Sequence, residues 1–142
     1  MENKGLVIVH TGDGKGKTTA ALGMAMRAWG NHLRVLILQF IKGSWKYGEL
    51  ESIKALASIN NHIEIRQGGL GFSQRGNGAE EEHRCAAAEL LQTAMDELRS
   101  NAWDMIILDE FNYAYSFGFI SLDELEQLLS VRPEKTHLIF TG

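Results

Sequence analysis

The apolar residues of this chain gather in five short runs that are separated by longer stretches of mixed polarity. The runs are rich in branched aliphatic residues and lie at 6–9, 34–40, 63–65, 105–108 and 137–140. A run without polar alternation is typical of a strand that is buried on both faces, as strands are inside a parallel sheet. We therefore expect five strands, and we expect 6–9 to be buried on both faces.

Four of the intervening stretches carry helical signals: 17–29, 47–59, 79–100 and 121–130. The first is apolar nearly all round, so that helix should be largely buried. The longest stretch places five apolar side chains on one helical face: Ala87, Leu91, Ala94, Met95 and Leu98. In the last stretch Ser121 and Glu124 have the spacing of a capping box, which predicts a helix start.

Strands and helices alternate along the whole chain. This order predicts right-handed crossovers and a mainly parallel sheet with helices on both faces, which is a three-layer α/β fold. A chain of 142 residues fits one domain, residues 1–142. The chain stops directly after a strand that looks buried, which is compatible with a domain that lacks a C-terminal segment.

Composition narrows the classes of partner and compartment. The net charge is −4 and no block of Lys or Arg is present, so we expect no nucleic-acid partner. The first apolar run is too short for a signal peptide or a membrane span, so we expect no membrane partner. The single cysteine, Cys85, allows no internal disulfide and fits a reducing cytoplasm, where we expect the protein to be.

A glycine-rich segment, Thr11–Thr19, connects the first strand to the first helix. Its glycines allow backbone angles that turn successive amides toward one anion: Gly12, Gly14 and Gly16. The helix that follows adds the positive end of its dipole, Lys17 adds a point charge, and the Thr18 hydroxyl can bind magnesium. The segment therefore predicts a nucleoside triphosphate site on a P-loop NTPase-like (RecA-like) fold. A glycine-rich turn without a ligand is the competing interpretation.

The strand at 105–108 delivers two carboxylates, Asp109 and Glu110, at its C-terminal end, where open α/β sheets bind ligands. In phosphate-loop proteins an acid at this place holds magnesium directly or through water. We expect Thr18, Asp109 and Glu110 to be the metal-binding residues, with a solvated acidic turn as the alternative. Hydrolases, kinases and transferases share both motifs, so these motifs leave the reaction open.

Several segments together resemble the ATP:corrinoid adenosyltransferases of the phosphate-loop type, the family that forms the cobalt–carbon bond of adenosylcobalamin. The resemblance is carried by 11–21, 34–43, 48–49, 69–72 and 104–118. Thr11 stands where the general phosphate-loop pattern has its first glycine, and a threonine there is usual in this family.

The resemblance implies that cob(I), the reduced corrinoid, attacks the 5′ carbon of ATP and that inorganic triphosphate leaves. It also implies that ATP is bound with Mg²⁺ or Mn²⁺, in the reverse sense to ordinary phosphate-loop enzymes. The residues implied to contact ATP are Gly12, Asp13, Gly14, Lys15, Gly16, Lys17, Thr18 and Thr19. Among the site residues, Lys17, Thr18 and Glu110 are the catalytic candidates, because the protein must neutralise a highly charged leaving group.

The candidate corrinoid-binding segment is 67–78, which holds five glycines and one aromatic residue, Phe72. A lid over a large planar ligand has this composition, and so has a plain surface loop. The family usually has tryptophan two residues after this phenylalanine, where this chain has Gln74. That departure leaves open how the lower face of the corrin is held.

The resemblance further implies a homodimer, a flavoprotein reductase as a partner, and an acceptor that is cob(I)alamin or a cobyrinic or cobinamide precursor. Two other functions stay open. One is a P-loop ATPase or small kinase. The other is a non-catalytic nucleotide- and corrinoid-binding protein, which is suggested by Gln74 and by the absence of the tail that the family carries after Thr141-Gly142.

Overall fold

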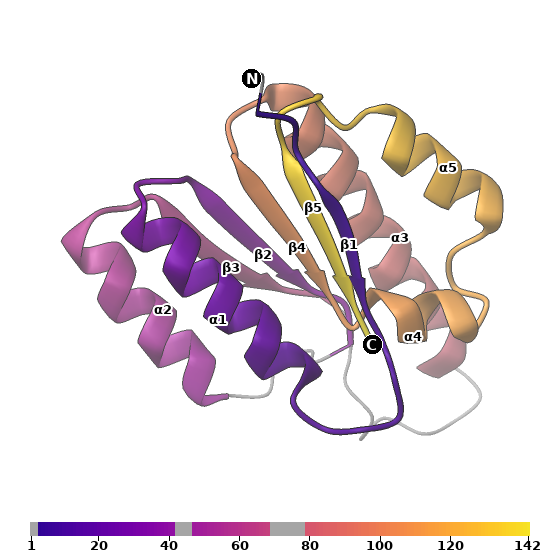
Figure 1. Cartoon of the computed structure of the whole chain (residues 1–142). Helices are drawn as coiled ribbons and strands as arrows, with labels where there is room; N and C mark the ends of the chain where they lie inside the picture. Colours follow the sequence, from indigo (N-terminus) through magenta and orange to yellow (C-terminus); the bar gives the residue numbers. More distant parts are fainter. Residues whose placement is uncertain (1–2, 42–46, 69–78) are drawn as a thin grey trace.

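The computed structural model describes residues 3–41, 47–68 and 79–142. Figure 1 shows a central sheet between two groups of helices. The strands are β1 (Val7–His10), β2 (Val35–Gln39), β3 (Ile63–Gln67), β4 (Met105–Asp109) and β5 (His137–Thr141). They form one sheet in the order β1-β5-β4-β2-β3, and each pair of neighbours is parallel. The expected three-layer α/β fold is thus confirmed.

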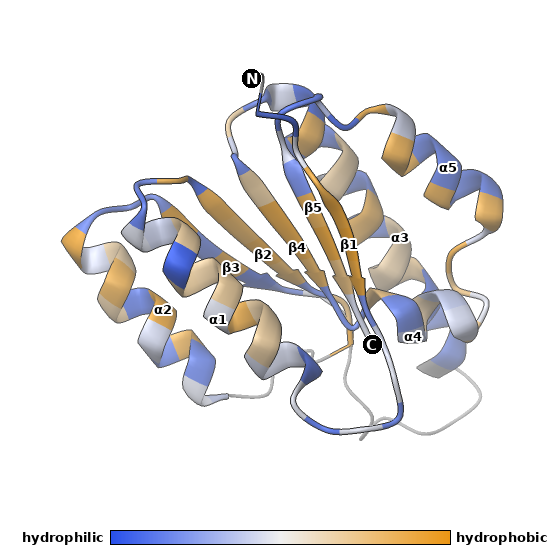
Figure 2. Ribbon diagram, viewed as in Figure 1, coloured by the Kyte–Doolittle hydropathy of each residue, from blue (hydrophilic) through white to orange (hydrophobic). Residues whose placement is uncertain are grey.

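The helices divide between the two faces of the sheet (Figure 1). One face is covered by α1 (Lys17–Gly30) and α2 (Gly48–Ile59), and the other by α3 (Ala79–Ser100), α4 (Phe111–Ser116) and α5 (Leu122–Ser130). Alternate residues of each central strand supply the two cores, as Leu36 and Ile37 of β2 do. The apolar strands between the helical layers are visible in Figure 2. Of the helices that the structure describes, none is long and apolar enough to span a membrane.

Helix α3 buries the face that its periodicity predicts. Its five predicted core residues are all buried: Ala87, Leu91, Ala94, Met95 and Leu98. The capping box of α5 is also confirmed. The Ser121 hydroxyl accepts a hydrogen bond from the Glu124 amide at 3.1 Å, and the Glu124 carboxylate accepts one from the Ser121 amide at 3.0 Å. These two bonds satisfy two amides that the helix itself leaves unpaired.

Two predictions of burial are wrong. Strand β1 lies at the edge of the sheet, and the side chains of Val7 and Val9 are 44% and 59% exposed. Helix α1 buries only the alanine face that meets the sheet, Ala21, Ala25 and Ala28, whereas Met26 is 58% exposed. Both errors have one cause. An apolar run shows that side chains are hydrophobic, but the packing of whole elements decides which side chains are covered: β1 lies at the sheet edge, and α1 has the sheet on one face only.

Helix α4 was not predicted. It begins at Phe111, immediately after the carboxylates that end β4, and it buries Phe111 and Ala114. Six residues are too few for a helical period to be recognised in the sequence. This short helix matters for the site, because it carries side chains into three neighbouring cavities.

Candidate active site

The segment Thr11–Thr19, here called the phosphate loop, has the backbone that its glycines were predicted to allow. Gly12 and Gly16 have φ angles of 143° and 98°, which residues with a Cβ rarely adopt. Gly16 is the N-cap of α1, and within the described residues no side chain caps this helix. The backbone amides of residues 12–16 donate no hydrogen bond to any of the residues that the structure describes. The loop therefore presents free donors and a helix N-terminus, the elements of an anion site.

The Lys17 ammonium lies across the phosphate loop. Its Nζ donates to the carbonyl oxygens of Gly12 at 2.6 Å and Gly14 at 2.8 Å. It also lies 5.9 Å from the centre of the Tyr113 ring of α4. These contacts fix a positive charge at the rim of the loop, where a phosphate oxygen can replace a carbonyl as its partner.

Two hollows open beside the loop, and Tyr113 lines both. The larger, of about 260 Å³, is lined by Gly14, Lys15, Gly16, Lys17, Thr18, Thr19, Glu110 and Tyr113. The smaller, of about 220 Å³, is lined by Thr11, Gly12, Asp13, Asn112, Tyr113, Ser116 and Gly142. Every predicted phosphate-contacting residue lines one of these two hollows.

The fold brings the three predicted metal residues together. The Thr18 hydroxyl, in the first turn of α1, donates to Asp109 Oδ1 at 2.8 Å and lies 3.4 Å from Glu110 Oε1. Three oxygen-bearing side chains thus converge beside the phosphate loop. Oxygen ligands of this kind, completed by phosphate and water, suit Mg²⁺.

The two acids have different surroundings. Asp109 is fully buried, and its Oδ1 also accepts a hydrogen bond from the Thr141 hydroxyl at 2.7 Å. Its Oδ2 accepts one from the side-chain Nε2 of Gln39 at 3.1 Å. Glu110 is only partly buried, adopts a left-handed φ of 63° and lines the larger hollow. Such a backbone is strained for a residue with a Cβ, so the surrounding structure must hold it there. The arrangement anchors Asp109 inside the fold and leaves Glu110 at the wall of the larger hollow.

Thr11 has a structural role that explains its place in the loop. Its hydroxyl donates to the carbonyl oxygen of Gly142 at 2.7 Å, and Asn112 donates to the same oxygen at 3.2 Å. The Gly142 amide in turn donates to the carbonyl of His10 at 3.2 Å. A glycine at position 11 would lack the hydroxyl that ties the start of the phosphate loop to the end of β5.

Sequence reasoning missed three residues of this site: Gln39, Tyr113 and Thr141. A signal existed for two of them, because Gln39 and Thr141 are polar residues at the C-terminal ends of strands that are mainly apolar. That edge is where open α/β sheets bind ligands. Tyr113 gave no comparable signal, since its helix was not predicted. Phe72 and Gln74, singled out for the corrinoid, lie outside the described residues.

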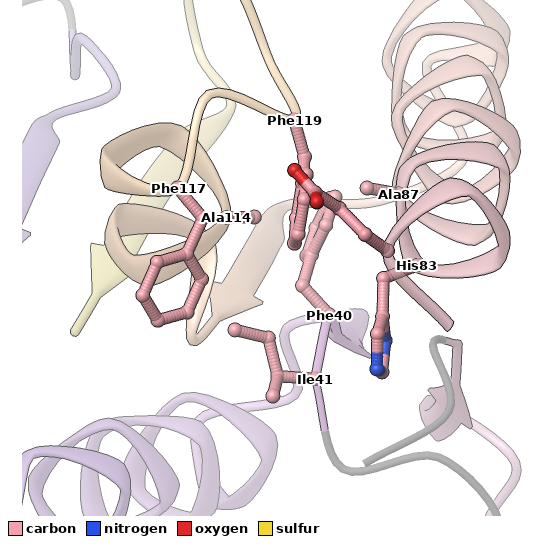
Figure 3. Close-up of a pocket in the computed structure, with 8 residues that line it drawn as sticks. Phe40, Ile41, His83, Ala87, Ala114, Phe117 and Phe119 are labelled. Atoms are coloured by element: carbon pink, nitrogen blue, oxygen red, sulfur yellow. The ribbon is translucent and has the colours of Figure 1, made fainter. Parts of the chain in front are cut away.

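A third hollow, here called the aromatic pocket, lies between α4 and the first turns of α3 (Figure 3). It measures about 340 Å³ and is lined by Phe40, Ile41, Glu80, His83, Ala87, Ala114, Phe117 and Phe119. These residues come from the end of β2, from the first turns of α3, and from α4 with the turn that follows it. Its walls are mainly apolar, in contrast to the polar hollows at the phosphate loop.

The parallel sheet and the loop with its acids define a class, the P-loop NTPase-like nucleotide-binding proteins. The fold is similar to the crystal structure of the flagellar accessory protein FlaH from Methanocaldococcus jannaschii, with a TM-score of 0.53 and 15% sequence identity. That likeness covers 96% of this chain and 60% of FlaH and concerns the fold alone.

Within this class, the chain belongs to the ATP:corrinoid adenosyltransferase family BtuR/CobO/CobP, whose sequence model matches residues 3–142. The corrinoid adenosyltransferase of Escherichia coli (strain K12) is 36% identical over 142 residues, which cover 100% of this chain and 69% of the relative. Corrinoid adenosyltransferase CobA of Salmonella typhimurium is 35% identical with the same coverage. The corrinoid adenosyltransferase of Pseudomonas aeruginosa is 30% identical, over 99% of this chain and 68% of that protein. The resemblance noted in the sequence is confirmed.

Proposed function

We propose that this protein transfers the 5′-deoxyadenosyl group of ATP to the cobalt of a reduced corrinoid and releases inorganic triphosphate. Membership of the family supports the reaction. The observation that carries the proposal for this chain is the meeting of Thr18 with Asp109 and Glu110 at the mouth of a loop with free amides. That arrangement is suited to a magnesium-bound polyphosphate.

The phosphate loop is proposed to bind the triphosphate. The free amides, the helix N-terminus and the ammonium groups of Lys15 and Lys17 can share its negative charge. Lys17 needs only to exchange the Gly12 and Gly14 carbonyls for phosphate oxygens. The Thr18 hydroxyl and the Glu110 carboxylate are the proposed direct ligands of Mg²⁺, and Asp109 supports them from its buried position. Bound there, the ion would neutralise charge on the phosphate oxygens.

In the proposed reaction an electron pair of cob(I) forms the bond to C5′ of ATP. The bond from C5′ to the α-phosphate oxygen breaks, and its electron pair leaves with triphosphate. Because cobalt is the nucleophile, no side chain has to attack and no water has to be activated. Lys17, Thr18 and Glu110 are therefore proposed to act by positioning the triphosphate and stabilising its growing charge. With ATP in the reversed orientation, C5′ faces the corrinoid.

The remaining expectations are proposals that follow from the family. The segment that carries Phe72 is proposed to cover the corrinoid, which is cobalamin or a cobyrinic or cobinamide precursor. A flavoprotein is proposed to supply the electron that produces cob(I), and the protein is proposed to act as a cytoplasmic homodimer. The single free cysteine, Cys85, is exposed and fits a reducing compartment.

An anaerobic assay with ATP, Mg²⁺ and chemically reduced cobalamin tests the reaction. We expect the cob(I) spectrum to disappear, a light-sensitive alkylcobalt product to appear, and one triphosphate to be released per cobalt. Formation of orthophosphate or ADP would instead indicate a P-loop ATPase or kinase. Binding of both ligands without any alkylcobalt product would indicate a non-catalytic nucleotide- and corrinoid-binding protein. Either of these results rejects the proposed transferase.

A further inference from the structure

Ring side chains form much of the wall of the aromatic pocket. His83 and Phe119 are stacked, with ring centres 6.2 Å apart and planes inclined by 14°. The ring centres of Phe117 and Phe119 are 5.8 Å apart, and the two ring planes are inclined by 56°. The side chain of Phe117 is 50% exposed. Two small buried residues, Ala87 of α3 and Ala114 of α4, also line the pocket, and their short side chains leave space between the two helices (Figure 3).

The aromatic wall is held in place from behind. The Arg84 guanidinium lies 5.6 Å from the centre of the Phe119 ring, and the same group donates to the carbonyl of Gly118 at 2.8 Å. These contacts fix the turn that carries Phe119 against the start of α3. A pocket wall that is already ordered loses little conformational entropy when a ligand binds. This favours a specific binding site over a nonspecific hydrophobic surface.

Two polar groups stand among the apolar ones. His83 and Glu80, about one helical turn apart on α3, supply a ring nitrogen and a carboxylate to the lining. Specific small-molecule sites combine apolar walls with a few such groups, and about 340 Å³ is at the lower end of their usual range of roughly 300–1,000 Å³. A flat nitrogen heterocycle, which stacks through its faces and hydrogen-bonds through its edge, matches this combination.

The aromatic pocket is adjacent to the residues of the phosphate site. Ala114 of the pocket donates its amide to the carbonyl of Glu110, a residue of the phosphate site, at 3.4 Å. On the other side, the Phe40 amide donates to the carbonyl of Asp109 at 2.9 Å. The pocket and the proposed metal residues are thus joined through the end of β4, about one helical turn apart.

We infer that the aromatic pocket binds the planar nitrogenous base of a substrate, stacked on Phe117 and Phe119 with its edge toward His83 and Glu80. The inference rests on the proposed function, in which two substrates carry such a base. One base is the adenine of ATP, and the other is the benzimidazole of the lower axial ligand in a complete corrinoid such as cobalamin. Inorganic triphosphate lacks the adenine together with its ribose, and cobinamide lacks the benzimidazole together with its ribose and phosphate; they serve as the matching ligands without the base.

The test compares each ligand with its partner that lacks the base, in wild-type protein and in Phe117→Ala. Calorimetry gives the affinities for ATP and for inorganic triphosphate, and titration of the ATP-bound protein gives those for cob(II)alamin and cob(II)inamide. Removing one stacking ring should weaken binding of the base-containing ligand about tenfold. Affinity for its partner without the base should stay within about twofold. Leu122→Ala, which removes another exposed apolar side chain from α5, is the matched control and should change none of the four affinities.

Selective loss of ATP affinity assigns the pocket to adenine, and selective loss of cobalamin affinity assigns it to the lower base. If both members of each pair change equally, or none changes, the inference is overturned. His83→Phe gives a second reading, because it keeps the flat ring and removes the ring nitrogens. It should reduce the preference for the correct base over a base with altered edge groups, measured as ATP against ITP or cobalamin against a purinyl cobamide. An unaltered preference in both comparisons removes His83 from the inference.

The pocket and the proposed function fail in different ways. A wild-type protein that forms adenosylcobalamin, with affinities that do not depend on Phe117, rejects the pocket alone. Suppose instead that the wild type makes no alkylcobalt product, while Phe117→Ala binds ATP more weakly and triphosphate as well as the wild type does. That result rejects the transferase and retains an adenine pocket.

Discussion

The hydroxyl of Thr18 lies 2.8 Å from Oδ1 of Asp109 and donates a hydrogen bond to it. This contact joins the first turn of α1 to the end of β4, the strand that follows α3 in the chain. It therefore fixes the distance between the phosphate loop and the acids, on which the proposed metal site depends.

Thr18→Val removes the hydroxyl while nearly preserving the shape of the side chain. We expect the gain in ATP affinity that Mg²⁺ provides to fall about tenfold, the scale of effect found when a group that supports a metal site is lost. Affinity measured in EDTA should change by less than about twofold. Calorimetry with and without Mg²⁺ makes the comparison, and Thr18→Ser should restore the wild-type response. Equal losses with and without the metal would contradict a role for Thr18 in metal binding.

Lys17→Ala removes the ammonium that lies across the phosphate loop. A charge-assisted hydrogen bond contributes about 1.5–3 kcal/mol, so ATP affinity should fall by a factor of about 10 to 150. Lys54→Ala is the control, because Lys54 is an exposed residue of α2. Its Nζ lies 3.7 Å from Oε1 of Glu51 on the same helix. The ATP affinity of Lys54→Ala should match that of the wild type. Wild-type affinity and turnover in Lys17→Ala would count against the whole phosphate site.

Two glycines, one at the N-cap of α1 and one inside that helix, should respond to replacement by alanine in opposite directions. Gly16 has a φ of 98°, so Gly16→Ala should reduce the free energy of unfolding by about 1–2 kcal/mol and weaken ATP binding. Gly23 lies inside the helix, with nothing within 4 Å of an added Cβ. Gly23→Ala should raise the free energy of unfolding by about 0.5–1 kcal/mol. Urea denaturation measures both, and a shift of the same sign in the two variants would refute the explanation.

The ion pair between Arg34 and Asp104 should make stability depend on pH. Hydrogen bonds from the Arg34 guanidinium, at 3.1 and 3.2 Å, hold the pKa of Asp104 below its ordinary value of 3.8. A lowered carboxylate pKa stabilises the fold above the unfolded-state value, and this stability is lost as the pH falls through the folded-state value. Both side chains are at least one-third exposed, so Arg34→Met should cost only about 0.5–1 kcal/mol at pH 7.

The stability difference between wild type and Arg34→Met should begin to shrink as the pH approaches 3.8 and should disappear below the lowered pKa of Asp104, measured by urea denaturation at a series of pH values. Arg99→Met serves as the control, since Arg99 lies 3.6 Å from Asp96 and both side chains are more than half exposed. It should show a smaller difference at pH 7. A difference for Arg34→Met that persists undiminished in acid would mean that lost packing, rather than the ion pair, causes it.

The sequence by itself determined the class of fold and the place of the phosphate site. Apolar runs and helical periods are local properties, and their alternation is compatible with few arrangements other than a parallel sheet between helices. The glycine spacing of the phosphate loop is local as well, because a left-handed φ at Gly12 and Gly16 is set by the absence of a Cβ at each residue. The carboxylates at the end of β4 could be placed at the ligand-binding edge for the same kind of reason.

Only the tertiary structure decided which residues meet at that edge. Asp109 accepts hydrogen bonds from Thr18, 91 positions away, and from Thr141, 32 positions away, and neither spacing is marked in the sequence. The exposure of β1 and the aromatic pocket depend in the same way on strand order and on how α3 and α4 pack. Contacts between distant segments arise from the free energy of burying whole elements against each other. A local pattern shows what an element is, but its neighbours are selected by the packing of the complete domain.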